Sequence, residues 1–199
     1  MNGFGYDPRA NGCKCDSCPL KGQQVVPPEG NPDARIAVIN EAPGLSELKH
    51  GKQWIGPAGA KLNELLFKAG LHRNQLWMTS ALLCRPEVPD KEGRRRFDPK
   101  EYVAWIRREN VKIRRENKAN KKAGLPGFSE RASPLDCCAP RLYGELHALD
   151  QKARAAGAPN GLVVVPLGSF ALGLLTTKPG AMQSILKYRG SVIFPKESA

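Results

Sequence analysis

The stretch from Arg35 to Gly59 constrains the fold of this chain more than any other. It begins with an apolar, β-branched run, Arg35–Asn40, which predicts a buried strand. Glu41 and a Pro–Gly pair follow and predict a tight loop, and Pro57 is a favoured first residue of a helix. This order is typical of open α/β folds, which bind ligands at the carboxyl ends of their strands. We therefore expect the Glu41 carboxylate at such an edge.

Strand and helix patterns alternate along the rest of the chain, which predicts a three-layer α/β/α sandwich with a short, mostly parallel central sheet. We expect a single domain over residues 1–199, with a poorly ordered lead-in at 1–12 and a basic helical insertion at 91–131. The further predicted strands are 76–83, 161–168 (the clearest buried strand) and one within 187–194. The predicted helices are 57–70, one from Asp98–Pro99 that ends before Gly124, 138–156 and 170–175.

Positive charge is concentrated in one part of the chain. The 199 residues carry 31 Lys and Arg against 19 Asp and Glu, a net charge of +12. Residues 91–131 hold 14 of these cations and 6 of the anions, so +8 of the net charge lies there. Such a surface indicates a polyanionic partner, most commonly nucleic acid. The alternatives are a basic surface that only aids solubility, and a solvated helix or protein-docking site within the insertion.

Six cysteines indicate a metal or cluster site rather than disulfides, because no apolar leader marks the chain for an oxidising compartment. Cys15 and Cys18 form a C-x-x-C pair, while Cys84 and Cys138 stand alone further on. Four thiolates suffice for a [4Fe–4S] cluster or for a tetrahedral zinc site. Widely separated single ligands favour the cluster. Unligated buried thiols are the third alternative, and two cysteines are left over in either metal site.

Seven segments, taken in order, carry a resemblance to a known family. They are CDSCPL at 15–20, ARIAVINEAPG at 34–44, GKQWIGPAGAKLNELL at 51–66, TSALLCRP at 79–86, CAPRL at 138–142, VVVPLGSFAL at 163–172 and YRG at 188–190. Together they resemble the iron–sulfur (family four, thermophile-type) branch of the uracil-DNA glycosylase superfamily. The resemblance covers nearly the whole chain except 91–131. It implies a DNA-repair enzyme that flips uracil out of DNA and hydrolyses its N-glycosidic bond.

The resemblance also implies roles for individual residues. A structural [4Fe–4S] cluster would be bound by Cys15, Cys18, Cys84 and Cys138. Glu41 would be the catalytic, water-positioning acid. The base would be contacted by the backbone at Ala42, Pro43 and Gly44, by Trp54 as an aromatic platform and by Ser80. DNA would be contacted by Gly56. Independently of the resemblance, we expect Arg94, Arg95 and Arg96 of the basic insertion to contact DNA, because they follow the strand that carries Ser80 and should emerge at the same edge of the sheet.

The chain departs from the family pattern at several positions. Ser80 stands where the family has an Asn that reads uracil, and Asn40 stands where the motif has Gly. No His-Pro-Ser motif follows Arg189–Gly190, and residues 91–131 contain no His for covalent capture of DNA. We therefore expect weak or absent turnover from the 199-residue form. The alternative function is a glycosylase-like DNA-binding module of a larger replication or repair protein, such as a phage DNA polymerase.

The remaining expectations concern location and partners. No apolar run is long enough to cross a membrane, so we expect no membrane association. We expect a monomer in the cytoplasm, or in the host cytoplasm for a phage protein. The expected partner is uracil-containing DNA, single or double stranded, with replication proteins as further partners.

Overall fold

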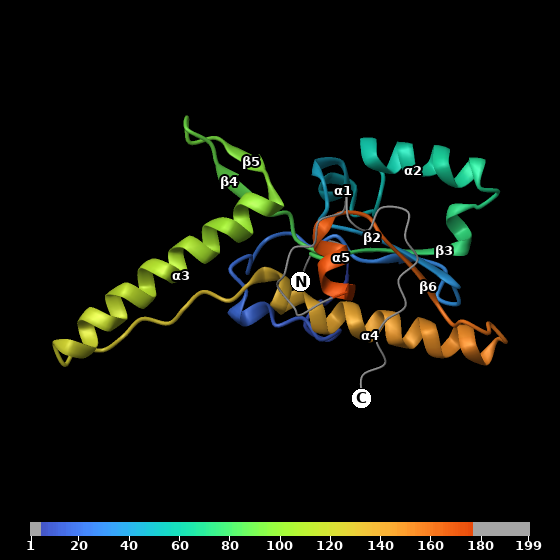
Figure 1. Cartoon of the computed structure of the whole chain (residues 1–199). Helices are drawn as coiled ribbons and strands as arrows, with labels where there is room; N and C mark the ends of the chain where they lie inside the picture. Colours follow the sequence, from blue (N-terminus) through green and yellow to red (C-terminus); the bar gives the residue numbers. More distant parts are fainter. Residues whose placement is uncertain (1–4, 177–199) are drawn as a thin grey trace.

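The computed structural model describes residues 5–176 of the chain (Figure 1). Its central sheet contains four strands in the order β1-β3-β2-β6. These are β1 (Glu29–Gly30), β2 (Ile36–Asn40), β3 (Leu76–Ser80) and β6 (Val163–Pro166). β2 runs parallel to both of its neighbours, and β1 is antiparallel to β3. The prediction of a mostly parallel sheet is confirmed, and the strand predicted within 187–194 lies outside the described residues.

The core has two halves because side chains of β2 alternate between the two faces of the sheet. Ala37 and Ile39 pack in an apolar cluster with α4 (Pro134–Ala155) and α5 (Ser169–Thr176). Val38 packs in a second cluster with α2 (Pro57–Lys68). Helices therefore cover both faces of the sheet (Figure 1), and the predicted three-layer architecture is confirmed.

Helix boundaries follow the capping signals of the sequence. α2 begins at Pro57 as predicted, and the carboxylate of Asp98 accepts a hydrogen bond from Glu101 N at 2.9 Å to cap α3 (Pro99–Lys122). α4 begins before the predicted start at Cys138, because Pro134 already suits the first turn of a helix. The short helix α1 (Leu45–His50) was not predicted, since its segment was expected to be only a loop.

The prediction that residues 161–168 form the clearest buried strand is wrong. β6 pairs only with β2 within the described sheet, so it lies at the edge of that sheet. Val163 is 52% exposed and Val165 is 36% exposed. The apolar run does form a strand parallel to β2, but its side chains are not buried on both faces of the sheet.

Residues 87–133 form an arm that projects away from the sheet (Figure 1). It contains a hairpin of β4 (Glu87–Pro89) and β5 (Arg95–Phe97), followed by α3. The hairpin was not predicted. Only the first turns of α3 are packed, through Tyr102, Val103 and Ile106, so the prediction of a lightly packed, charged helix is confirmed.

Residues 5–12, for which the composition predicts little order, form hydrogen-bonded turns. Gly12 N donates to Arg9 O at 3.0 Å, and the Asn11 side chain donates to Asp7 O at 2.9 Å. Two short 3₁₀ helices, Cys15–Ser17 and Arg73–Gln75, complete the described elements. None of the helices within residues 5–176 is both long and apolar enough to cross a membrane.

Candidate functional site

Glu41 follows the last residue of β2 and lies at the carboxyl edge of the sheet, as predicted. Its Oε1 accepts three hydrogen bonds from the start of α5: from Ser169 N at 2.6 Å, Ser169 Oγ at 2.8 Å and Phe170 N at 3.4 Å. Among residues 5–176, all hydrogen bonds to this carboxylate are accepted by Oε1. Oε2 is therefore the oxygen left for a water or a ligand.

Gly168 lets the carboxylate approach this closely. Its φ is +110°, and a Cβ at this position would lie 2.3 Å from Glu41 Cγ. Sequence reasoning assigned Ser169 only to a helix cap and missed its contact with Glu41. The Gly168–Ser169 pair just after β6 could have indicated this contact. The carboxyl ends of parallel strands share one edge of the sheet, so residues that follow two such strands lie close together.

The loop at Ala42, Pro43 and Gly44 is held against a second loop by a residue that the sequence analysis did not single out. Glu47 in α1 is buried, and its Oε1 accepts a hydrogen bond from Gly56 N at 2.8 Å. A Cβ at Gly44 would lie 2.6 Å from Glu47 Oε2, so the packing is tight. The backbone N–H of Gly56, which was expected to contact DNA, is therefore already used by Glu47.

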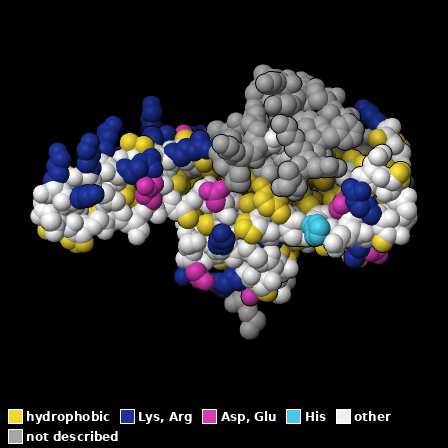
Figure 2. All heavy atoms as spheres, turned by 60° about the horizontal axis from the view of Figure 1, so that its bottom comes forward, with side chains coloured by type: hydrophobic (Ala, Val, Ile, Leu, Met, Phe, Trp, Pro, Cys, Tyr) yellow, Lys and Arg dark blue, Asp and Glu magenta, His cyan; other side chains and the backbone are white. Residues whose placement is uncertain are grey.

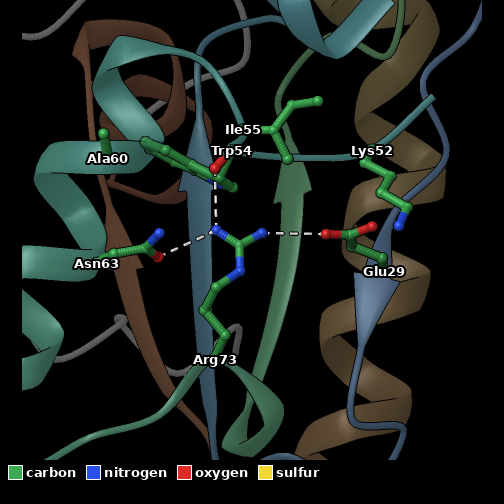
Figure 3. Close-up of a pocket in the computed structure, with 7 residues that line it drawn as sticks. All are labelled: Glu29, Lys52, Trp54, Ile55, Ala60, Asn63 and Arg73. Atoms are coloured by element: carbon green, nitrogen blue, oxygen red, sulfur yellow. Dashed lines mark hydrogen bonds and ion pairs between the residues drawn. The ribbon is translucent and has the colours of Figure 1, made fainter. Parts of the chain in front are cut away.

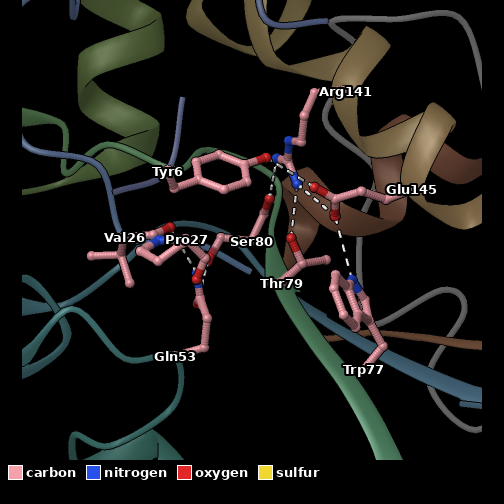
Figure 4. A network of polar contacts seen from close by, with 9 residues as sticks. All are labelled: Tyr6, Val26, Pro27, Gln53, Trp77, Thr79, Ser80, Arg141 and Glu145. Atoms are coloured by element: carbon pink, nitrogen blue, oxygen red, sulfur yellow. Dashed lines mark hydrogen bonds and ion pairs between the residues drawn. The ribbon is translucent and has the colours of Figure 1, made fainter. Parts of the chain in front are cut away.

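Ser80 is fully buried at the carboxyl end of β3, directly beside Asn40 in the parallel register. Its Oγ donates to Gln53 Oε1 at 2.7 Å, and Gln53 Nε2 donates to the carbonyls of Val26 and Pro27 at 3.2 Å each (Figure 4). The hydrogen-bond donors of Ser80 and Gln53 are therefore all used in contacts within the protein. Gln53 was missed because nothing in its sequence neighbourhood indicates a buried amide.

Asn40 is the other polar side chain at this end of the sheet. Its Nδ2 donates to Ala42 O at 3.4 Å, whereas its buried Oδ1 has no hydrogen-bond partner among the described residues. Even-numbered residues of β2 and β3 face α2, as Val38 and Met78 do. Asn40 and Ser80 therefore share one face, and Asn40 presents the unsatisfied acceptor.

Trp54 lies on the same face, but its side chain is only 5% exposed and packs against Leu62, Leu66 and Met78. The structure thus buries the ring that was expected to stack on a base. Trp54 has a φ of +56°, the left-handed region that a non-glycine residue rarely adopts. A Cβ at Gly59 would lie 1.7 Å from Trp54 O, so α2 can approach this turn only with glycine there.

Arg73 hydrogen-bonds to the backbone of the turn that contains Trp54 (Figure 3). Its guanidinium donates to Trp54 O at 2.9 Å and to Gln53 O at 2.8 Å, and it pairs with Glu29 at 3.1 Å. An open pocket of about 430 Å³ is lined by Arg73, Trp54 and Glu29 together with Lys52, Ile55, Ala60 and Asn63. Arg73 therefore fixes the backbone of the segment that carries Trp54, which is a role the sequence did not indicate.

The six cysteines are free thiols and come from three parts of the chain. Three lie in the N-terminal segment, one lies in the segment that follows β3, and two lie in α4. Lys14 N donates to Cys137 O at 2.9 Å, which joins the first C-x-x-C pair to α4. Burial, reinforced by the neighbouring thiols of Cys138 and Cys15, raises the pKa of Cys84 to about 12. Burial also raises the pKa of Cys18, with contributions from Cys84 and Cys138. The four predicted ligands therefore lie close enough to perturb one another.

The thiols nonetheless do not form a ready metal site. Within residues 5–176, no group of three or more His, Cys, Asp or Glu side chains is arranged to hold a metal ion. A hydrogen bond from Cys13 lowers the pKa of the Cys138 thiol to about 6, against the opposing effect of burial. Cys13, left over in the sequence analysis, is thus a direct neighbour of Cys138. The donor set suits thiolate ligation, and ligation by four cysteines requires Cys138 to exchange this contact for a metal bond.

A buried cation, Arg141, joins α4 to the end of β3 (Figure 4). Arg141 is fully buried and donates to Thr79 Oγ1 at 2.7 Å, Ser80 O at 2.7 Å and Glu145 Oε2 at 3.1 Å. Trp77 Nε1 also donates to Glu145 at 3.4 Å. The sequence analysis did not identify this network, because an Arg and a Glu one turn apart on a helix are usually a solvent-exposed pair.

The three consecutive arginines lie on the hairpin of the arm. Arg94 is paired with Asp90 at 2.9 Å and with Glu92 at 3.0 Å, and Arg96 is paired with Asp98 at 3.3 Å. Two of the three predicted DNA contacts are therefore partly neutralised by their own neighbours.

Comparison with known proteins adds the family context. A sequence model of the Uracil DNA glycosylase superfamily matches residues 27–194. The chain is 41% identical over 75 residues to the type-4 uracil-DNA glycosylase of Thermotoga maritima, covering 37% of this chain and 39% of that protein. It is 36% identical over 83 residues to the type-4 enzyme of Pyrobaculum aerophilum (39% and 42%), and 41% identical over 73 residues to that of Archaeoglobus fulgidus (37% and 36%). These alignments span less than half the length of each relative.

Proposed function

Because the chain belongs to the uracil DNA glycosylase superfamily, we propose that it binds DNA and hydrolyses the N-glycosidic bond of deoxyuridine. The observation that carries this proposal is the Glu41 carboxylate, which is held through Oε1 at the carboxyl edge of the sheet. The relatives aligned with this chain are named type-4 uracil-DNA glycosylases. The reaction is that of a DNA-repair enzyme that removes a base from its sugar.

Two chemical demands of this reaction are met by groups at this edge. Cleavage builds positive charge on the sugar and negative charge on the leaving base. The free Oε2 of Glu41 can orient water and stabilise the sugar cation, while backbone donors of the loop at residues 42–44 can stabilise the base anion. A base must first leave the duplex stack to reach this edge.

Recognition of the base is the step in which this chain differs from the family pattern. Ser80 is occupied by Gln53, whereas Asn40 keeps an unsatisfied buried acceptor on the same face. We propose that Asn40 Oδ1 accepts the imide N–H of uracil. Stacking on Trp54 requires the indole to move from its packed position against α2, since the ring is 5% exposed.

We further propose a [4Fe–4S] cluster bound by Cys15, Cys18, Cys84 and Cys138, with zinc as the alternative metal. The support is the donor set itself: four free thiols, with Cys138 buried and the other three partly buried, come from the N-terminal segment, the segment after β3 and α4. A cluster would supply covalent cross-links between the N-terminal segment, the residues after β3 and α4. We assign it no step in the cleavage reaction.

The test is excision from a labelled oligonucleotide that contains one uracil, followed by alkaline cleavage of abasic sites. At high enzyme excess, the expected result is weak strand cleavage by the wild-type chain that Glu41→Gln reduces at least about a hundredfold. Glu64→Gln is the matched control, because Glu64 is an exposed acid on α2 whose ion-pair partners within residues 5–176 are Lys61 and Lys68. DNA binding with no excision at high enzyme excess, in this form and in a longer one, would instead support the DNA-binding module.

A further inference from the structure

The arm has one covered side, because the segment at 125–133 returns along α3. Three asparagines of α3 hold this segment through its backbone. Asn110 Nδ2 donates to Arg131 O at 2.8 Å while Asn110 Oδ1 accepts from Arg131 N at 2.7 Å. Asn117 makes the same pair of bonds with Phe128, at 2.8 and 2.6 Å, and Asn120 donates to Pro126 O at 3.0 Å. The covered side of α3 is therefore fixed by its own chain.

The opposite side of α3 is basic and exposed. Successive residues of an α-helix are rotated by about 100°, so Arg108, Arg115 and Lys122 form one row on the side away from the three asparagines. Lys118 lies beside this row, and all four side chains are exposed. Figure 2 shows Lys and Arg side chains along this side of the arm. We call Arg108, Arg115, Lys118 and Lys122 the basic face.

Most of the charge on the basic face is not neutralised. Arg108 pairs with Glu101 near the base of the arm. Within residues 5–176, no carboxylate lies within ion-pair distance of Arg115, Lys118 or Lys122, which occupy the far half of α3. The far half of the arm therefore offers a row of cations to a partner.

We propose that the basic face of α3 lies along the sugar–phosphate backbone of the DNA that flanks the bound nucleotide. The basic face runs from Arg108 to Lys122, about 21 Å along the helix axis, which is more than half a turn of duplex DNA. A regular row of cations without base-reading side chains suits phosphates, which carry no sequence information.

Charge and polarity favour DNA over a protein partner for this surface. The core of a protein–protein interface is depleted of charged residues and enriched in aromatic ones. The most exposed apolar side chains of the arm, Leu125 and Phe128, lie on the return segment. Val111 is the one exposed large apolar residue of α3, and it lies beside the four cations of the basic face. A contact along the basic face extends the DNA footprint of the proposed site. It rests on the part of the proposed function that makes DNA the substrate, and it does not require base excision.

The experiment measures binding of the whole chain to undamaged duplex DNA by fluorescence anisotropy over a range of salt concentrations. The triple variant Arg115→Ala, Lys118→Ala, Lys122→Ala keeps the helix, because Ala has the highest helix propensity. Each lost phosphate contact reduces the slope of log affinity against log salt by about 0.9. We expect a slope reduced by roughly two to three units, and equal weakening for every sequence.

The matched control removes three cations elsewhere: Lys61→Ala, Lys68→Ala, Lys152→Ala. This variant has the same net charge, so a slope close to that of the wild type separates local contact from long-range attraction. Shortening the duplex to about one turn should weaken the wild type but not the arm variant. An unchanged slope in a folded arm variant overturns the proposal, and an acidic protein would then be the partner to test. Because no excision is measured, failure of the glycosylase activity leaves this result interpretable.

Discussion

Glu41 and Ser169 lie 128 residues apart in the chain, yet both the backbone N and the hydroxyl of Ser169 donate to one oxygen of the Glu41 carboxylate. The parallel pairing of β2 with β6 brings them together, because Asn40 ends one strand and Pro166 ends the other. The start of α5 thereby positions the proposed catalytic acid.

The first prediction concerns the Ser169 hydroxyl. Ser169→Ala removes one donor to a carboxylate, an interaction worth about 1.5–3 kcal/mol, and leaves the backbone donor in place. We expect kcat for uracil excision to fall on the order of tenfold, with KM little changed, as measured by single-turnover and steady-state kinetics. Thr176→Val is the control, because Thr176 Oγ1 donates to Leu172 O at 2.7 Å on the same helix without touching Glu41. Full kcat in Ser169→Ala would show that Glu41 does not depend on this contact.

The second prediction concerns Gly168. Gly168→Ala places a methyl group 2.3 Å from Glu41 Cγ at a φ of +110°, so the chain must shift or Glu41 must move. We expect a loss of stability of about 1–3 kcal/mol, measured by urea denaturation, together with reduced excision. Gly144→Ala in α4 is the control, because a Cβ there has nothing within 4 Å and should stabilise the helix by about 0.5–1 kcal/mol. Equal stability of the two variants would contradict the packing around Glu41.

The third prediction concerns the buried amide of Gln53. Gln53→Ala leaves the carbonyls of Val26 and Pro27 and the hydroxyl of Ser80 without their partner. Each buried unsatisfied group costs about 1–3 kcal/mol, so we expect a clear loss in the free energy of unfolding. Gln24→Ala is the control, since Gln24 is exposed and donates only to Leu48 O. A Gln53 variant as stable as the Gln24 variant would rule out the structural role of this pair.

The fourth prediction concerns the cluster. Anaerobically purified protein should be brown and contain about four iron and four sulfide per chain, as a cysteinyl [4Fe–4S] cluster requires. Cys15→Ser and Cys84→Ser should lose this iron and lower the solubility, because the cluster ties distant segments together. Cys137→Ser should retain the iron, since Cys137 is outside the proposed ligand set. One zinc per chain and no iron would replace the cluster with a tetrahedral site.

The fifth prediction concerns Arg141. Removing one partner of a buried ion pair costs about 3–5 kcal/mol, because the other charge is left uncompensated. Arg141→Met should therefore lower the free energy of unfolding strongly, and the double variant with Glu145→Gln should recover part of the loss. Lys152→Met at an exposed pair is the control. An Arg141 variant with wild-type stability would contradict the buried network.

The sequence by itself determined the layers of the fold and the place of the proposed catalytic acid. Local geometry is enough to predict these elements, as the β-branched run at 36–40, Pro57 and the Asp98–Pro99 cap show. Such signals favour a strand or a helix start whatever the rest of the fold is. The position of Glu41 followed in the same way, because a loop that follows a parallel strand must lie at its carboxyl edge. The resemblance of the ordered motifs supplied the family, which the match over residues 27–194 then established.

Only the tertiary structure decided which side chains the site can use. Burial of Trp54, the Ser80–Gln53 pair and the contact of Gly56 with Glu47 join residues from different elements, and no local pattern encodes such partners. The same holds for the edge position of β6, which depends on pairing and not on hydrophobicity. On the arm, the total charge was visible in the sequence. Which cations remain free of carboxylates depended on the side of α3 that the return segment covers.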